Sequence, residues 1–341
     1  MTVRDSLGLA CAVGLLVATS AAASTNHQPG SLSAHEPGRS AIWEPSAGHS
    51  QVPIWPGAAP DALRAVAPET VGPPLRRDWW PRANNVSRPT MTIYAPSGQN
   101  TGAAAVVFPG GGYQFLAMDL EGTEVCDWLT SRGITCILLK YRVPDSGPTW
   151  KDGYRYYPQV PTALQDAQRT LGLIRARAAE YHIDTDKIGV VGFSAGGHLA
   201  AALSTSFAKR AYGAIDAADA VSCRPDFAII VYPGHLWVHE DEDEGLRDAS
   251  DLKLRPDIHV GPETPPTFLL HAEDDKVDSV QQSLTYYLAL KQAGVGAELH
   301  IYSQGGHAFG VRPTRLPIGQ WPGLAEQWLK SIGMLRSPQT R

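Results

Sequence analysis

Hydrophobic residues along this chain form short apolar runs that alternate with longer stretches of mixed polarity. The apolar runs predict strands at 90–94, 103–108, 134–141, 187–192, 226–232, 266–270 and 298–302, because strands are short and either continuously apolar or alternating. Stretches with apolar residues three and four positions apart predict helices at about 121–131, 164–181, 195–206, 279–293 and 324–332.

Alternating strands and helices are typical of an α/β fold, in which helices cover both faces of a mostly parallel sheet. Sheets of this kind bind their ligands beyond the carboxyl ends of the strands. We therefore expect the functional residues in the loops that follow strands.

The composition narrows the classes of protein further. The chain has 341 residues, 43% of them hydrophobic, and a net charge of −5. This apolar share is ordinary for a globular protein and excludes a disordered chain. Lysine and arginine, 29 in all, do not exceed the 34 aspartates and glutamates. No basic excess is available to bind a phosphate backbone, so we expect no nucleic-acid partner.

The first residues have the features of an export signal. Arg4 precedes an apolar stretch at 7–18, and small residues lead to a cleavage site after Ala23. An uncleaved anchor is the alternative, but the apolar stretch is short for a membrane span. We therefore expect a signal peptide at 1–23, a periplasmic or secreted mature chain, and no stable membrane insertion after cleavage.

The rest of the chain divides into two unequal parts. Residues 24–60 are rich in Ser, Pro, Gly, Ala and His without a regular period, which predicts a flexible segment or a strap over the surface. The α/β domain is expected at 61–341. Within it, the irregular and partly acidic stretch 233–265 is the candidate for a lid or rim.

Three cysteines follow the signal, namely Cys126, Cys136 and Cys223. An odd number cannot all pair within the chain, and none has the spacing of a zinc site. Cys126 and Cys136 lie in a predicted helix and the next strand, where a disulfide would fit. Buried free thiols are the simpler expectation.

The strongest motif is Gly192-Phe193-Ser194-Ala195-Gly196, a G-x-S-x-G. It follows an apolar strand and opens an alanine-rich helix, which is the setting of a nucleophile elbow. Glycines at both ends of the motif allow the sharp turn that would expose the Ser194 hydroxyl. The motif therefore predicts a nucleophilic serine.

A serine hydroxyl needs a base, and the base needs an acid to orient it. His307 follows the last strand among glycines and is the candidate base, with His235 and His239 as weaker rivals. Asp274 and Asp275 follow an earlier strand and are the candidate acids. The chain order serine, aspartate, histidine is typical of α/β-hydrolases, but the spacing does not choose between the two aspartates.

An oxyanion hole requires backbone N–H groups that point at the developing negative charge. Ala195, at the start of the helix, offers one such group. Gly111 and Gly112, after an early strand, offer others because a residue without Cβ lets the backbone approach the substrate.

Several motifs then occur in a recognisable order: Phe108-Pro109-Gly110-Gly111-Gly112-Tyr113, Glu121-Gly122, Trp128-Leu129, Lys140-Tyr141-Arg142 and Gly192 to Ala200. Residues 89–335 thereby resemble the bacterial α/β-hydrolases of the acetyl-xylan and feruloyl esterase type. The resemblance favours Asp275 over Asp274, because the family's aspartate lies four residues after a histidine, here His271. It also maps the oxyanion donors onto Gly111 and Gly112.

The resemblance implies a serine esterase without metal or cofactor, with an oligosaccharide or small-molecule ester as substrate and acetyl groups on xylan as the favoured target. Ser194, His307 and Asp275 would be catalytic, and Tyr113 and Phe193 would contact the substrate. Aromatic residues could form sugar-stacking surfaces: Trp79, Trp80, Tyr113, Tyr156, Tyr157 and Trp237. The alternatives are a general short-chain carboxylesterase, a feruloyl esterase, a peptidase of the prolyl-oligopeptidase type and a non-catalytic binding protein.

Overall fold

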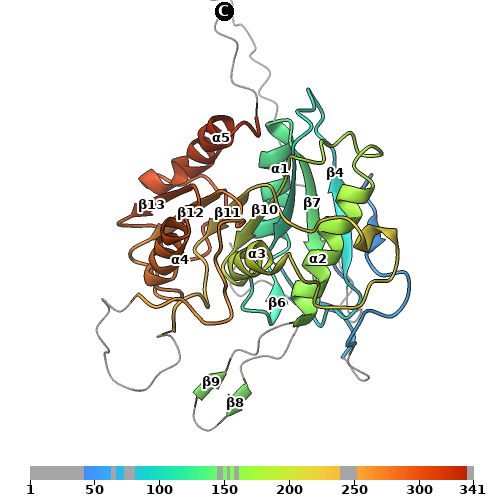
Figure 1. The fold of residues 1–341 in the computed structure, drawn as a ribbon, viewed down its shortest axis with the longest axis horizontal. Coiled ribbons are helices and arrows are strands. Elements are labelled where there is room, and N and C mark those ends of the chain that lie inside the picture. Colours follow the sequence, from blue (N-terminus) through green and yellow to red (C-terminus); the bar gives the residue numbers. More distant parts are fainter. Residues whose placement is uncertain are drawn as a thin grey trace, which may run out of the picture. The chain divides into compact units, whose positions relative to one another are not determined.

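Eight strands form the central sheet of the computed structural model, in the order β1-β4-β7-β5-β10-β11-β12-β13 (Figure 1). Their bounds are β1 Gln51–Pro53, β4 Thr90–Tyr94, β5 Ala104–Phe108, β7 Thr135–Lys140, β10 Ile188–Phe193, β11 Ala228–Val231, β12 Thr267–Ala272 and β13 Ala297–Tyr302. The strands from β7 to β13 in this order pair in parallel, whereas β1 and β4 are antiparallel to their neighbours. This confirms the α/β fold with a mostly parallel sheet.

The structure describes residues 42–62, 67–72, 81–143, 149–151, 154–156, 161–238 and 252–335. Several predictions lie outside these residues: the signal peptide at 1–23, the acidic run at 240–244, and the side chains of Trp79, Trp80 and Tyr157. The backbone of Tyr156 is described, but its side chain is not. The described residues, between 42 and 335, form one compact unit.

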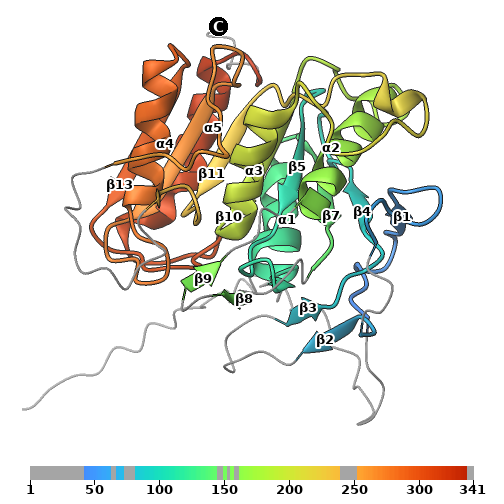
Figure 2. The same ribbon diagram turned by 60° about the horizontal axis from the view of Figure 1, so that its bottom comes forward.

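Helices cover both faces of the sheet. They are α1 Glu124–Ser131, α2 Pro161–Ala176, α3 Ala195–Ser206, α4 Gln281–Gln292 and α5 Trp321–Ser331. Helices α2, α3 and α4 lie in a row across one face (Figures 1 and 2). Helices α1 and α5 share the other face, where the rings of Trp128 and Trp321 pack 5.3 Å apart.

Smaller elements lie at the margins of the sheet. Strands β2 Thr70–Gly72, β3 Arg82–Asn84 and β6 Phe115–Leu116 form a second sheet, and β8 Thr149–Lys151 pairs with β9 Tyr154–Tyr156. Short helical turns occupy Asp119–Thr123, Ala217–Asp219 and Pro317–Gln320. Sequence periodicity predicted none of these strands, because two- and three-residue elements are too short to show a period.

The central strands are buried along their whole length, which explains why their sequences are continuously apolar. Every residue of β5, β7, β10, β11 and β12 is buried, as expected for parallel strands covered on both faces. Because these strands run in the same direction, the loops after β5, β10, β11, β12 and β13 meet at one edge of the sheet.

Of the two alternatives predicted for 24–60, a flexible segment or a strap over the surface, the described part, 42–60, forms the strap. Trp43, Ile54 and Trp55 are buried there, and β1 pairs with β4. The Trp55 indole N–H donates a hydrogen bond to Asp166 at 2.8 Å. Isolated aromatic anchors hold this strap against the core, although proline and glycine hide any regular period.

The expectation of free thiols at Cys126 and Cys136 is wrong. Helix α1 lies against β7, and the two cysteines form a disulfide with their Cα atoms 5.2 Å apart. Cys223 is buried and is not in a disulfide. Of the three cysteines after residue 23, two therefore form a disulfide and the third is a buried free thiol.

Candidate active site

Ser194 lies in a strained turn between β10 and α3. Its φ is +51°, which is unusual for a residue with a side chain. A Cβ at Gly192 would overlap the carbonyl of Gly196, and a Cβ at Gly196 would overlap the carbonyl of Phe108. Glycine at both positions is therefore a steric requirement of the turn, and the turn places the largely buried serine at the carboxyl edge of the sheet.

A continuous chain of hydrogen bonds links the predicted serine, histidine and aspartate. The Ser194 Oγ and His307 Nε2 atoms are 3.0 Å apart, and His307 Nδ1 lies 2.6 Å from Asp275 Oδ2. Because a carboxylate only accepts, Nδ1 donates to Asp275 and Nε2 is left to accept the serine proton. The structure thus brings together three residues from the loops after β10, β12 and β13.

The two adjacent aspartates have different partners. Asp275 binds His307, whereas Asp274 Oδ1 accepts the backbone N–H groups of Gly305 and Gly306 at 2.8 and 2.7 Å. Asp274 therefore holds the loop that carries His307. The structure places Asp275, the aspartate favoured by the resemblance, against the histidine.

The electrostatics of this chain favour a charged aspartate and a basic histidine. Burial opposes ionisation of Asp275, but hydrogen bonds from His271, His307 and the Val277 N–H outweigh it and hold its pKa below the usual range. Burial alone would lower the pKa of His307. The bond to Asp275 and the negative charge of Asp278 outweigh burial, so the His307 pKa is raised above 6.5.

The three expected oxyanion donors lie in turns that leave their N–H groups unused. Gly111 has a φ of +131° and Gly112 a φ of +61°, and a Cβ at Gly111 would overlap the Phe115 carbonyl. Ala195 is the first residue of α3, so its N–H lacks an intrahelical acceptor. In the described part of the chain, these three N–H groups donate to no protein acceptor. They are available to an anionic oxygen.

A buried network, which the sequence did not reveal, joins the glycine loop to the histidine loop. Glu121 accepts the Gly110 N–H at 2.7 Å and the Tyr232 hydroxyl at 2.8 Å. The same hydroxyl accepts the Gly310 N–H at 3.1 Å, and the Tyr232 ring lies 4.8 Å from that of His307. Burial raises the pKa of Glu121. The network fixes both loops around the serine.

A further carboxylate, Asp278, also lies beside the serine. Its Oδ2 atom is 3.3 Å from Ser194 Oγ and 3.6 Å from His307 Nε2. Sequence reasoning did not select it. The only signal was a third aspartate shortly after Asp274 and Asp275.

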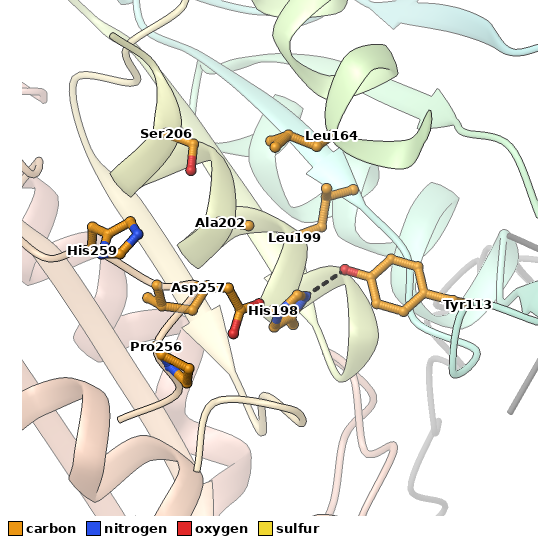
Figure 3. Close-up of a pocket in the computed structure, with 10 residues that line it drawn as sticks. Tyr113, Leu164, His198, Leu199, Ala202, Ser206, Pro256, Asp257 and His259 are labelled. Atoms are coloured by element: carbon orange, nitrogen blue, oxygen red, sulfur yellow. Dashed lines mark hydrogen bonds between the residues drawn. The ribbon is translucent and has the colours of Figure 1, made fainter. Parts of the chain in front are cut away.

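A cavity of about 540 Å³ lies along the outer side of α3 (Figure 3). Tyr113 and His198 occupy the end nearest the nucleophile elbow, since Tyr113 follows the glycine loop and the His198 N–H donates to the Ser194 carbonyl. Apolar residues of α2 and α3 form one wall, and residues 256–259 form the other. Part of the stretch predicted as a lid or rim therefore lines this cavity.

His198 and Tyr113 are joined inside the cavity. The Tyr113 hydroxyl lies 2.7 Å from His198 Nδ1, as the dashed line in Figure 3 shows. Burial, with a contribution from Arg255, lowers the pKa of His198 to about 3, so this imidazole is neutral at ordinary pH. Sequence reasoning did not select His198 as a site residue.

The other predicted substrate residues behave differently. Phe193 is fully buried, and its ring packs 5.8 Å from Tyr232 and 6.2 Å from Trp321. The prediction that its side chain binds substrate is wrong, because the last residue of β10 faces the core on the α5 side. Trp237 bridges to Leu254 and does not line the cavity. The rival base His235 packs near Tyr113 and His198, whereas His239 lies outside the described residues.

The described residues hold no group of three His, Cys, Asp or Glu side chains arranged to bind a metal ion. Across these same ranges, every helix is too short or too polar to cross a membrane.

Comparison with known proteins gives consistent matches. A model of the prolyl oligopeptidase family matches residues 123–325. An acetylxylan esterase from Xylanibacter ruminicola is 29% identical over 261 residues, which are 71% of this chain and 47% of that protein. This chain therefore spans about half the length of that relative.

Two solved structures resemble the fold. An acetyl ester-xyloside bifunctional hydrolase from Caldicellulosiruptor lactoaceticus has 31% identity and a TM-score of 0.63, and the match covers 84% of this chain and 97% of that one. A thermophilic esterase from Thermogutta terrifontis with bound propionate has 25% identity and a TM-score of 0.57, over 74% of this chain and 94% of that one.

Proposed function

The chain belongs to the prolyl oligopeptidase family, and on that premise we propose that it is a serine esterase that works through an acyl-enzyme. The observation that carries the proposal is the hydrogen-bonded chain from Ser194 through His307 to Asp275. A hydroxyl, a base and an orienting carboxylate in this geometry make up the machinery of acyl transfer.

The reaction follows from the position of each group. Ser194 Oγ attacks the ester carbonyl while His307 Nε2 takes its proton, and the N–H groups of Gly111, Gly112 and Ala195 bind the resulting oxyanion. The imidazolium then gives its proton to the departing alcohol, leaving the acyl group on Ser194. Water, deprotonated by the same imidazole, releases the acid and restores the serine.

The proposed substrate is an acetyl ester of a xylan-type sugar. Relatives described as an acetylxylan esterase and an acetyl ester-xyloside hydrolase support this choice. The cavity beside the elbow supports it as well, because apolar residues combined with a few polar groups suit a sugar ring. We assign this cavity to the alcohol part of the ester, and the fixed imidazole of His198 to a hydrogen bond with a sugar hydroxyl.

A peptidase is the second candidate, because the matching family is named for oligopeptidases. Cleaving an amide uses the same three residues, but the amine is a poorer leaving group than the alcohol of an ester. Relatives described as esterases favour ester hydrolysis.

We also propose that the mature protein is periplasmic or secreted. The disulfide between Cys126 and Cys136 supports an oxidising compartment. Cell fractionation followed by the intact mass of the mature chain, with and without reductant, would test both the cleavage after Ala23 and the disulfide.

The deciding experiment measures acetate release from acetylated xylo-oligosaccharides, p-nitrophenyl acetate hydrolysis and cleavage of a peptidyl-prolyl anilide. The intact chain and Ser194→Ala are compared on all three. We expect turnover of both esters by the intact chain and none by the variant. Anilide cleavage at a rate similar to ester cleavage would favour a peptidase. Ester turnover that survives in Ser194→Ala would refute the proposed nucleophile.

A further inference from the structure

We propose that Asp278 is a second catalytic carboxylate. It accepts a hydrogen bond from the Ser194 hydroxyl and stabilises the imidazolium of His307. The inference rests on the proposed function and adds a fourth residue to the reacting group. It rests on atoms that lie together: Asp278 Oδ2 is 3.3 Å from Ser194 Oγ and 3.6 Å from His307 Nε2.

The backbone of Asp278 is held on both sides by hydrogen bonds to neighbouring side chains. Its N–H donates to Asp275 Oδ1 at 3.1 Å, and its carbonyl accepts the His271 Nε2–H at 3.0 Å. Nδ1 of the same histidine accepts the hydroxyl of Ser283 at 2.8 Å. The turn from Asp275 to Asp278 therefore points both carboxylates at His307, one at each ring nitrogen.

The opposite side of Asp278 is closed by a glycine. A Cβ at Gly234 would come within 2.6 Å of Asp278 Oδ1 and 3.0 Å of Oδ2. Gly234 N–H also donates to the Ser194 carbonyl at 3.4 Å. Only 7% of Asp278 is exposed, so the carboxylate lies in a confined space with the reacting atoms.

Such a carboxylate has a definite effect on proton transfer. In the resting enzyme, the single serine proton is donated to one of two acceptors at a time, Asp278 Oδ2 or His307 Nε2. The hydroxyl turns from Asp278 to His307 before the proton is transferred. When His307 takes the proton, its new N–H faces a negative charge, which favours the cation. No proton is taken from solution in this step, and Asp278 stays ionised while it interacts with the imidazolium.

Other titratable groups face the same pair and must be considered. Asp275 and His271 come from β12 and its following loop, Glu121 from the turn before α1, and Tyr232 from the end of β11. Burial raises the pKa of Asp278, and the charge of Asp275 adds to this effect. The acid limb of activity therefore reports the coupled pair of His307 and Asp278.

The test is the pH profile of p-nitrophenyl acetate hydrolysis by Asp278→Asn. The amide keeps the size of the side chain and removes the charge. Because an opposite charge at this distance shifts a pKa by about one unit or more, we expect the acid limb of kcat/KM to move down by about one pH unit. The alkaline plateau should fall by about three- to ten-fold, because a less basic imidazole accepts the serine proton less readily.

Two further variants separate charge from structure. Gly234→Ala keeps Asp278 but displaces its carboxylate, so the acid limb should move in the same direction by a smaller amount. Glu273→Gln removes an exposed charge near the same loop and should leave the limb in place, since solvent and salt screen that charge.

A uniform loss at every pH, with an unmoved acid limb in both Asp278→Asn and Gly234→Ala, would overturn the proposal. The Ser194→Ala control separates failure of the Asp278 proposal from failure of the proposed function. If Ser194→Ala is inactive while the acid limb of Asp278→Asn is unmoved, only the role of Asp278 is wrong. If Ser194→Ala remains active, the proposed function itself has failed.

Discussion

Ser194 separates two regions that are built in different ways. On its reactive side, loops after β12 and β13 are connected by short hydrogen bonds through His307 and Asp275. On its pocket side, the cavity along α3 is lined by apolar residues of α2 and α3, by the pair Tyr113 and His198, and on the opposite wall by Asp257 and His259. In the first region two carboxylates lie against the reacting groups, whereas in the second the imidazole nearest the elbow is neutral and the wall formed by α2 and α3 is apolar.

This difference implies that the two regions control different kinetic constants. Groups that stabilise charge developing in the transition state act on kcat. Groups that hold the alcohol part of the substrate contribute to binding before and during the reaction. Substitutions on the reactive side should therefore lower the rate with every ester, and those on the pocket side should affect sugar esters selectively.

The largest effect is expected from His307→Ala. Without a base the serine keeps its proton, so kcat should fall by about 10⁴- to 10⁶-fold on every ester. Steady-state kinetics with p-nitrophenyl acetate and acetylated xylo-oligosaccharides measure this directly. If His307→Ala lost activity on the sugar ester only, the view that the reactive side controls the rate with every ester would be contradicted.

The same substitution at two adjacent residues gives the next test. Asp275→Asn should lower kcat by about 10³- to 10⁴-fold, because an amide no longer fixes the tautomer or stabilises the imidazolium. Asp274→Asn keeps an oxygen that accepts from Gly305 and Gly306, so kcat should fall by less than about three-fold. Equal losses would show that the loop anchor matters as much as the acid.

The pH dependence should differ between the two regions as well. Only the neutral imidazole of His307 acts as a base, and its pKa is raised above 6.5. Activity should therefore already be falling at a pH above 6.5 as the solution is acidified. His198, whose pKa is lowered to about 3, stays neutral, so KM for the sugar ester should not follow this limb. A midpoint below 6.5 would contradict the geometry around His307.

A smaller and substrate-selective effect is expected on the pocket side, from His198→Ala. Loss of one hydrogen bond to a sugar hydroxyl should lower kcat/KM for acetylated xylo-oligosaccharides by about ten-fold, and for p-nitrophenyl acetate by far less. His300→Ala is the matched control, because His300 hydrogen-bonds Glu298 on β13 outside the cavity. Equal losses on both substrates would argue against a sugar site.

Much of the reactive side could be predicted because its signals are local. The strand, the turn and the helix around Ser194 adjoin in the sequence, and both glycines of the motif are required by contacts within a few residues or with β5. His307 and Asp275 follow strands of a parallel sheet, and parallel strands bring the loops at their carboxyl ends together. Chain order was therefore enough to nominate His307 and the adjacent pair Asp274 and Asp275, whereas only the resemblance favoured Asp275.

The failures and the open alternatives share a different cause. Phe193 adjoins Ser194 in the sequence, but the last residue of β10 packs against Trp321. Trp43 and Trp55 anchor the strap at 42–60 through contacts with distant residues, including Asp166. Periodicity reports local conformation and average burial, so it does not show which distant side chain a residue will contact.

The amino-acid sequence alone therefore determines the α/β alternation, the elbow at Ser194, the candidate base His307 and the pair of candidate acids Asp274 and Asp275. The contact of Asp278 with Ser194, the bond between Tyr113 and His198, and the network through Glu121 and Tyr232 arise only when the chain is folded. Each of these contacts joins side chains from separate loops, and their distances depend on how the sheet brings those loops together. A functional residue in a local turn, such as Ser194, can be recognised from the sequence, whereas a contact between side chains of separate loops depends on how those loops pack.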